Sequence, residues 1–154
     1  MKASVILQLI DIYYFKETWH KNKLPVKQAF IHFETAFFRE NLIVSVDNKG
    51  NVLGYMEYWR INYEQLGRLL CKDDFLYDLE DTSSGNICYF ANTWIDPRER
   101  KDEVFRQMKH LFFVNNKNCE VIVGEPSKRP NTVKIYKKPE VDKWAESETA
   151  ALPL

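Results

Sequence analysis

The chain has 154 residues, of which 45% are apolar and 14% aromatic, enough to build the core of one domain. Its 22 basic and 22 acidic residues balance, which argues against a nucleic-acid binder driven by overall charge. Three cysteines lie far apart and form no Cys-x-x-Cys pair. That spacing argues against a zinc site and favours buried free thiols in a reducing compartment.

The N-terminus has one feature of a signal peptide, an apolar run over residues 3–10. Asp11 interrupts this run and no small-residue cleavage site follows it. No apolar stretch of the sequence reaches the length of a transmembrane helix. We therefore expect a soluble cytoplasmic protein without a membrane span.

The N-terminal half predicts two helices followed by a β-hairpin. Residues 3–19 are apolar nearly all round, which predicts a largely buried helix. Pro25 suits the first turn of a second helix, whose apolar residues recur on one face. Residues 42–46 and 52–61 read as strands, joined by a turn in which Asn and Gly accept positive φ. The alternation within 52–61 predicts one buried face and one face lined by aromatic rings.

The C-terminal half predicts a strand-helix-strand unit at 87–124. A short helix at 63–72 and an acidic segment at 73–85, either a solvated loop or a short helix, precede it. Residues 87–95 form an unusually apolar run, which favours a central strand, and a second apolar run follows at 120–124. The helix between them places a set of apolar residues on one face: Val104, Phe105, Met108, Leu111 and Phe112.

The last ordered element predicted is a strand at 132–136, which alternates polar and apolar residues. From Pro139 onward the chain is polar and Ala-rich without a periodic face, so we expect 139–154 to be a disordered tail. The sequence thus predicts one α+β domain over 1–138, with two N-terminal helices and a central, mostly antiparallel sheet.

This order of elements resembles the GNAT superfamily of N-acyltransferases over roughly residues 3–138. In that family the central strand splays from its neighbour, and acyl-CoA lies in the gap with its pyrophosphate on the following helix. The resemblance implies carrier-binding roles for Trp94 at the strand end and for Arg98, Arg100 and Lys101 after it. It implies acyl-CoA or an acyl carrier protein as co-substrate, with no tightly bound cofactor.

The glycine signature of the family, Arg/Gln-x-x-Gly-x-Gly/Ala, is missing at the matching place, where residues 96–103 contain no glycine. Glycines let a backbone approach a phosphate closely. Here Asp96 suits the N-cap, Pro97 the first helical position and Glu99 the third, as in a capping box. An ordinary capped helix is therefore the alternative to a phosphate site.

Two further stretches are similar to the toxin-activating acyltransferases, a divergent GNAT-like family that moves a fatty acyl group from acyl carrier protein to a lysine. One runs from His20 to Val26 and is one residue longer than the family's His-Arg-Asn-Trp-Pro-Val. The other runs from Tyr89 to Pro97 and is one residue longer than the family's Trp-Phe-Ile-Asp-Trp-Ile-Ala-Pro. The match implies His20 as the general base. The position of the family's catalytic Asp falls on Asn92, which cannot act as a base and would serve as a polar partner in the cleft.

Other candidates are weaker. Tyr136 is compared with the tyrosine that many GNATs use as a general acid, although Asn131 precedes it by five residues where the family has an Asn seven before. A strand aromatic in the core is the alternative. His32 and His110 lie within predicted helices, and no His pair has metal-ligand spacing, so no metal site is expected. A basic cluster either holds a phosphate-bearing carrier or an acidic partner protein, or protects an edge strand. Its members are Lys128, Arg129, Lys134, Lys137 and Lys138.

The leading hypothesis is an acyltransferase that moves an acyl group from acyl-CoA or acyl carrier protein to an amine, either a lysine or a small molecule. The alternative is a non-catalytic GNAT-like module that binds or inhibits another protein, supported by the missing glycines and by Asn92. The sequence leaves the oligomeric state, the acyl group and the acceptor open.

Overall fold

The computed structural model describes residues 2–16, 23–71, 74–99, 101–124 and 134–137. Its centre is a five-stranded sheet in the order β1-β2-β3-β4-β5. The strands are β1 (Leu42–Val46), β2 (Val52–Ile61), β3 (Ile87–Ile95), β4 (Val121–Gly124) and β5 (Lys134–Lys137). Only β3 and β4 pair in parallel, and the other neighbours are antiparallel. The mostly antiparallel sheet and the strand-helix-strand unit are confirmed.

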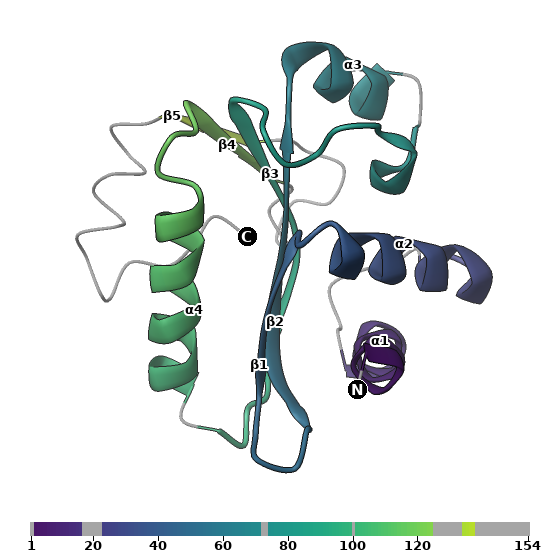
Figure 1. Cartoon of the computed structure of the whole chain (residues 1–154), viewed down its shortest axis with the longest axis vertical. Helices are drawn as coiled ribbons and strands as arrows, with labels where there is room; N and C mark the ends of the chain where they lie inside the picture. The colour runs from purple at the N-terminus through teal and green to yellow at the C-terminus, as the bar shows by residue number, and fades with distance from the viewer. Residues whose placement is uncertain (1, 17–22, 72–73, 100, 125–133, 138–154) are drawn as a thin grey trace.

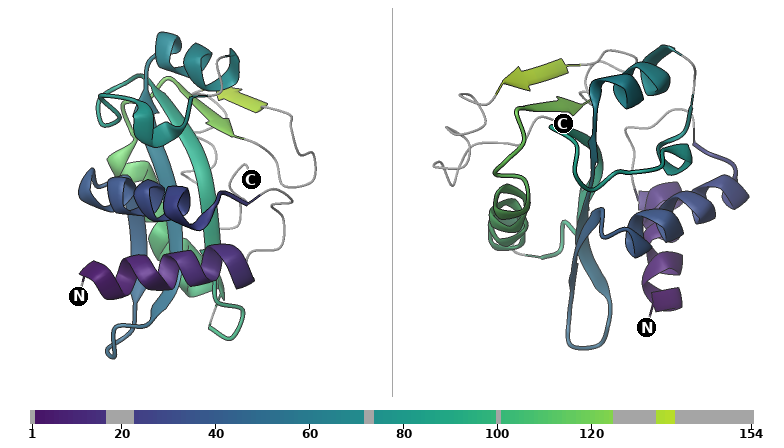
Figure 2. Two further views of the ribbon diagram at one scale, coloured as in Figure 1. Left: turned by 90° about the vertical axis from the view of Figure 1, so that its right-hand side faces the viewer. Right: turned by 45° about the horizontal axis from the view of Figure 1, so that its top comes forward.

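Helices cover both faces of the sheet (Figure 1). On one face lie α1 (Lys2–Asp11), its π-helical continuation η1 (Ile12–Lys16), α2 (Val26–Phe38), α3 (Tyr63–Cys71) and the short 3-10 turn η2 (Leu76–Asp78). The other face carries α4 (Lys101–Asn115). Figure 2 shows α1 and α2 lying across the sheet. The parallel β3–β4 pair is joined through α4, as the parallel geometry requires.

The turn between β1 and β2 forms as the sequence predicts. Gly50 has a φ of 82°, a conformation that favours glycine. Asp47 Oδ1 accepts hydrogen bonds from the backbone N–H groups of Lys49, at 2.8 Å, and Asn51, at 2.9 Å. The carboxylate therefore closes the turn from within and sets the start of β2.

Strand β2 is buried on both faces, so the expectation of one face open and lined by aromatic rings is wrong. Tyr55 and Trp59 pack in the clusters under α1, α2 and α3, while Met56 and Tyr58 pack under α4. Alternation predicts the two sets correctly, but only the helices on both sides decide that neither set reaches solvent.

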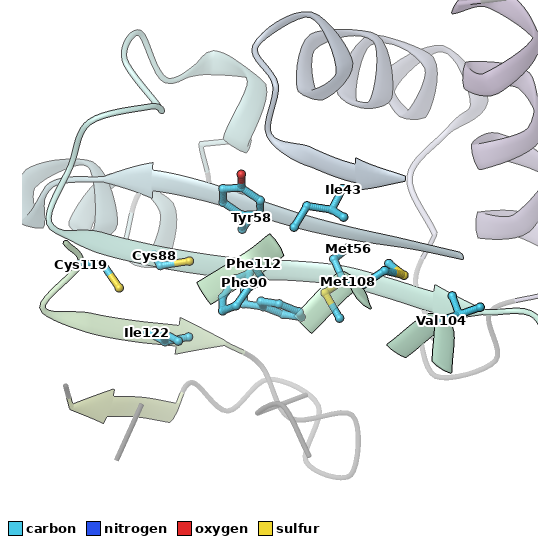
Figure 3. Close-up of a cluster of buried hydrophobic side chains, with 10 residues drawn as sticks. All are labelled: Ile43, Met56, Tyr58, Cys88, Phe90, Val104, Met108, Phe112, Cys119 and Ile122. Carbon is cyan, nitrogen blue, oxygen red and sulfur yellow. The ribbon is translucent and has the colours of Figure 1, made fainter. Parts of the chain in front are cut away.

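The core between α4 and the sheet is shown in Figure 3. Phe112 is fully buried there, with its ring edge-on to Tyr58 at 5.6 Å and to Phe90 at 5.1 Å between ring centroids. Burial of a ring of this size is worth roughly 1.5–3 kcal/mol. Leu111, expected on the same face, is 48% exposed, so the buried stripe of α4 is narrower than predicted.

Other expectations are corrected in part. Cys88 and Cys119 are buried free thiols, as expected, but Cys71 is exposed. No helix in the described ranges combines the length and apolarity that crossing a membrane demands. Residues 139–154, expected to be a disordered tail, lie outside the described residues.

Candidate functional site at the open end of strand β3

Strand β3 is paired on both sides for only part of its length. Its partners in β4 run from the pair Ile87 and Val121 to the pair Phe90 and Gly124. β4 ends at Gly124 and so does not reach residues 91–95 of β3, whereas β2 still pairs with Thr93, Trp94 and Ile95. We call this second half of β3, which β4 does not cover, the open edge of β3; it lies where the resemblance predicts the carrier site.

A β-bulge lies where the open edge begins. Tyr58 pairs with Phe90 and Met56 with Thr93, so Glu57 opposes two residues of β3, Ala91 and Asn92. A bulge of this kind reverses the side on which later side chains emerge. Accordingly Ala91 and Asn92 both face the α2 side, where Ala91 packs in a core cluster and Asn92 bonds to Glu57.

Glu57 is a fully buried carboxylate that accepts hydrogen bonds from three side chains. His32 Nε2 lies 2.8 Å from each oxygen of Glu57, Trp59 Nε1 donates at 2.7 Å and Asn92 Nδ2 at 3.2 Å. Because a carboxylate only accepts, the proton of this contact belongs to His32 Nε2. We name these four residues the Glu57 network.

The pKa of Glu57 lies below its ordinary value as the balance of opposed effects. Burial raises the pKa because it penalises the charged form. The attraction to His32 and the hydrogen bonds from His32, Trp59 and Asn92 lower it and outweigh burial. Glu57 is therefore ionised. Its carboxylate binds side chains from α2, from β2 and from the bulge of β3, and so holds these three elements together.

His32 reaches this carboxylate because of its place on α2. The buried face of that helix carries Ala29, His32, Phe33 and Ala36, at the spacing of one helical face. The imidazole is 7% exposed and lies 5.5 Å from the ring of Trp59, centroid to centroid. Reading His32 as a helical residue without a role thus missed its ion pair.

Sequence reasoning also missed Glu57. The signal was present, because Glu57 is a lone carboxylate in the middle of an apolar strand, between Met56 and Tyr58. Buried charges are rare and are paired when they occur. Its partners could not be named, because His32 and Asn92 lie 25 and 35 positions away in the chain.

The turn after β3 differs from the predicted capping box. Helix α4 begins at Lys101, so Asp96 is not its N-cap. Glu99 N donates to Asp96 O at 3.1 Å and Arg98 N donates to Asp96 Oδ1 at 2.9 Å, which closes a turn with Pro97 at its second position. Asp is favoured at the first position of such a turn and Pro at the second. Because of this turn, α4 begins about one helical turn later than predicted.

Arg98, predicted to bind the carrier, pairs with Asp96. Its Nη2 lies 2.8 Å from Asp96 Oδ2, and this hydrogen-bonded guanidinium, opposed by burial, lowers the pKa of Asp96. The Arg98 side chain is nonetheless 81% exposed. Arg98 remains accessible from solvent, but its charge is already shared with Asp96.

Trp94, the second predicted carrier residue, is buried. It is 7% exposed and packs in the cluster beneath α1 and α2. The Lys16 ammonium lies 5.3 Å from the centre of its ring, within cation–π range. Trp94 therefore supports the open edge of β3 from behind, and the positive charge of Lys16 stands beside it.

The remaining predicted residues are not placed by their side chains. His20 and Arg100 lie outside the described residues, as do the side chains of Lys101 and Tyr136. The backbone places Lys101 at the start of α4 and pairs Tyr136 with Ile122 of β4. After the segment that holds His20, the chain is fixed to η1: Leu24 N donates to Tyr13 Oη at 2.9 Å. Asn92 is thus the one predicted catalytic residue with a described side chain.

No group of three or more His, Cys, Asp or Glu side chains in the described ranges is arranged to hold a metal ion. Nor does any known protein-family profile match the sequence. A comparison with curated proteins also finds no match.

A comparison of structures does find similar folds. One of them is the loading GNATL domain of CurA from Lyngbya majuscula, with a TM-score of 0.55 and 15% identity. The alignment covers 82% of this chain and 62% of that one. The fold is GNAT-like. At this identity the likeness carries over the arrangement of helices and strands, and this GNAT-like chain spans less than two thirds of the compared domain.

Proposed function

We propose that this protein transfers an acyl group from a thioester carrier, acyl-CoA or an acyl carrier protein, to an amine. The observation that supports the proposal best is the open edge of β3 beyond Phe90, next to a bulge in a GNAT-like fold. Backbone N–H groups that point away from β2, on a stretch that β4 does not cover, can donate to a thioester carbonyl.

In the proposed reaction the amine nitrogen attacks the thioester carbonyl carbon. The C–N bond forms, the C–S bond breaks, and the carrier leaves as a thiol after taking up a proton. Asp96 N donates to Leu53 O. By the alternation of antiparallel strands, the N–H groups of Thr93 and Ile95 therefore point away from β2. These two groups would stabilise the negative oxygen of the tetrahedral intermediate. His20 is proposed as the base that removes the amine proton, and Tyr136 as the acid that protonates the thiolate.

The carrier would approach the C-terminal end of β3, where basic side chains stand among acidic ones. Lys16 and Arg98 stand there, and the order of the chain adds Arg100 and Lys101 directly after. Without glycines, side chains rather than a backbone cradle would hold the phosphate. The compared domain is described as a loading domain, which supports including an acyl carrier protein among the carriers.

A non-catalytic binding or inhibitory module on the same fold is the second candidate. Its supporting observation is that the polar groups near β3 satisfy one another. Glu57 holds Asn92, and Asp96 holds Arg98. Groups engaged in this way are costly to redirect toward a substrate.

Ligand-induced stabilisation followed by product analysis separates the two candidates. Thermal unfolding is measured with CoA, acetyl-CoA, a long-chain acyl-CoA and an acylated carrier protein. A carrier present at 100 times its dissociation constant stabilises the folded state by about 2.7 kcal/mol. Amine acylation is then followed by mass spectrometry in the wild type and in His20→Ala, with His110→Ala, on the exposed surface of α4, as the matched control.

Loss of product in His20→Ala alone, with unchanged unfolding, supports the proposed base. No stabilisation by any carrier would refute the transferase and leave the binding module. Stabilisation with unchanged turnover in His20→Ala would keep the transferase and remove His20 from its mechanism.

A further inference from the structure

Strand β1 is an edge of the sheet whose outer backbone groups have no partner in the described part of the chain. Tyr58 N donates to Asn41 O at 3.0 Å, so Asn41 and Tyr58 form a hydrogen-bonded pair. This pair sets which residues of β1 are hydrogen-bonded to β2. Bonded and non-bonded pairs alternate in antiparallel strands. The N–H and C=O groups of Leu42 and Val44, which pair with Glu57 and Tyr55, therefore point away from β2.

A groove of about 750 Å³ follows this edge. Leu42 and Val44 line it together with residues at the C-terminal ends of α2 and α4 and on β2: Phe37, Phe38, Glu40, Tyr58 and Asn115. The two helices lie on opposite sides of the sheet (Figure 1). Phe38 is 60% exposed, and Val46 at the end of β1 is 48% exposed. The groove thus places the exposed ring of Phe38 beside polar groups, among them backbone groups that a further strand would satisfy.

The two edges of the sheet differ in how they are protected. β5 has lysines at both ends, Lys134 and Lys137, and charged residues of this kind discourage pairing with another chain. β1, with the sequence Leu-Ile-Val-Ser-Val, contains no charge and no proline. An edge strand without charges or proline, such as β1, can pair with a strand from another chain, whereas the lysines of β5 disfavour such pairing.

We propose that the β1 edge binds the β1 edge of a second copy of this chain, making one continuous sheet through a two-fold axis. In the antiparallel arrangement centred on Ile43, Leu42 of each copy faces Val44 of the other. Each of the four outward N–H groups then meets an outward C=O. The Phe38 rings of the two copies come to lie beside the new pair of strands, which removes them from water.

The charges that flank β1 suit this arrangement. Arg39 and Glu40 precede the strand, and Asp47 and Lys49 follow it in the turn. Antiparallel pairing centred on Ile43 brings Arg39 of one copy opposite Asp47 of the other, once at each end of the interface. The opposite charges of these two residues favour this orientation.

Analytical ultracentrifugation of the full chain over a concentration series tests the proposal. We expect a dimer for the wild type. Val44→Pro removes an outward N–H that makes no bond to β2. Phe38→Lys replaces the ring that the dimer would remove from water with a charge, and each variant should weaken the dimer about tenfold or more. Ile135→Lys, at an exposed site on the opposite edge, is the matched control and should leave the dimer intact.

Circular dichroism verifies that each variant is folded, and Phe38→Lys decides the matter if Val44→Pro does not fold. A monomeric wild type at the highest concentration would overturn the proposal. A dimer that survives Phe38→Lys, or one that dissociates in Ile135→Lys, would overturn it as well. None of these outcomes depends on acyl transfer.

Discussion

The imidazole of His32 lies 2.8 Å from both carboxylate oxygens of Glu57, with both side chains buried between α2 and the sheet. This contact contributes less to stability than its short distance suggests, because the buried carboxylate has lost its hydration. Removing His32 is costly, because the charge of Glu57 then remains buried with fewer donors. The contact therefore makes the protein sensitive to change at either residue.

Glu57→Gln should lower the free energy of unfolding by about 3–5 kcal/mol, the usual cost of breaking a buried ion pair. The amide NH₂ would face donors on His32, Trp59 and Asn92. Urea unfolding followed by circular dichroism measures the change. Glu80→Gln, whose side chain is 87% exposed, is the control and should stay within about 0.5 kcal/mol of the wild type. A loss below about 1 kcal/mol in Glu57→Gln would contradict the network.

The effects of His32→Gln and Glu57→Gln should not add. Either single change already breaks the contact between His32 and Glu57. The double variant should therefore lose less unfolding free energy than the sum of the losses in the two single variants. We expect a coupling of about 0.5–3 kcal/mol from the double-mutant cycle in urea. Additive losses would show that the two side chains act independently in the folded protein.

Acid should destabilise the wild type partly through Glu57. Its pKa is lower in the folded state than its ordinary value of 4.5, so it stabilises the fold above pH 4.5. This contribution is lost as the pH falls through the folded pKa. The difference in unfolding free energy between the wild type and Glu57→Gln should therefore shrink below about pH 4.5. A difference that stays constant down to the acid transition would argue against an ionised Glu57.

Asn92→Asp would introduce the carboxylate that the sequence resemblance to the toxin-activating acyltransferases leads one to expect at this place. Here it would stand against Glu57, at the 3.2 Å contact that the Asn92 amide now makes. Two buried carboxylates so close cannot both ionise easily, and the loss should be about 1–3 kcal/mol or more at neutral pH. Unfolding of Asn92→Asp and Asn92→Ser at neutral and mildly acidic pH measures it. The Asp variant should recover toward the Ser variant as the pH falls, and no such recovery would refute the repulsion.

Phe112→Ala should cost about 3–5 kcal/mol, since it empties the centre of the core beneath α4. Leu111→Ala, one position earlier and 48% exposed, is the control and should cost far less. Thermal or urea unfolding compares them directly. Equal losses would mean that the helix is rotated from the orientation described.

The strands were predictable because each is a run of apolar and β-branched residues bounded by turn residues. Residues 42–46, 52–61 and 87–95 coincide with β1, β2 and β3. The start of α4 was not predictable. Asp96-Pro97 suits both a helix N-terminus and a tight turn, and the bond from Arg98 to Asp96 favours the turn. Local sequence cannot rank two local structures that the same residues support.

By itself the sequence determined the elements, their order and the mixed, mostly antiparallel sheet of a GNAT-like fold, because hydrophobic periodicity and turn chemistry act over a few neighbouring residues. Only the tertiary structure decided where β3 stops pairing with β4, which side of its bulge Asn92 faces, and that Glu57 is a buried charge held by His32. The orientation of Asn92 and the burial of Glu57 depend on contacts between residues 35 and 25 positions apart in the chain. A charge buried in a core is stable only when the fold brings partners to it.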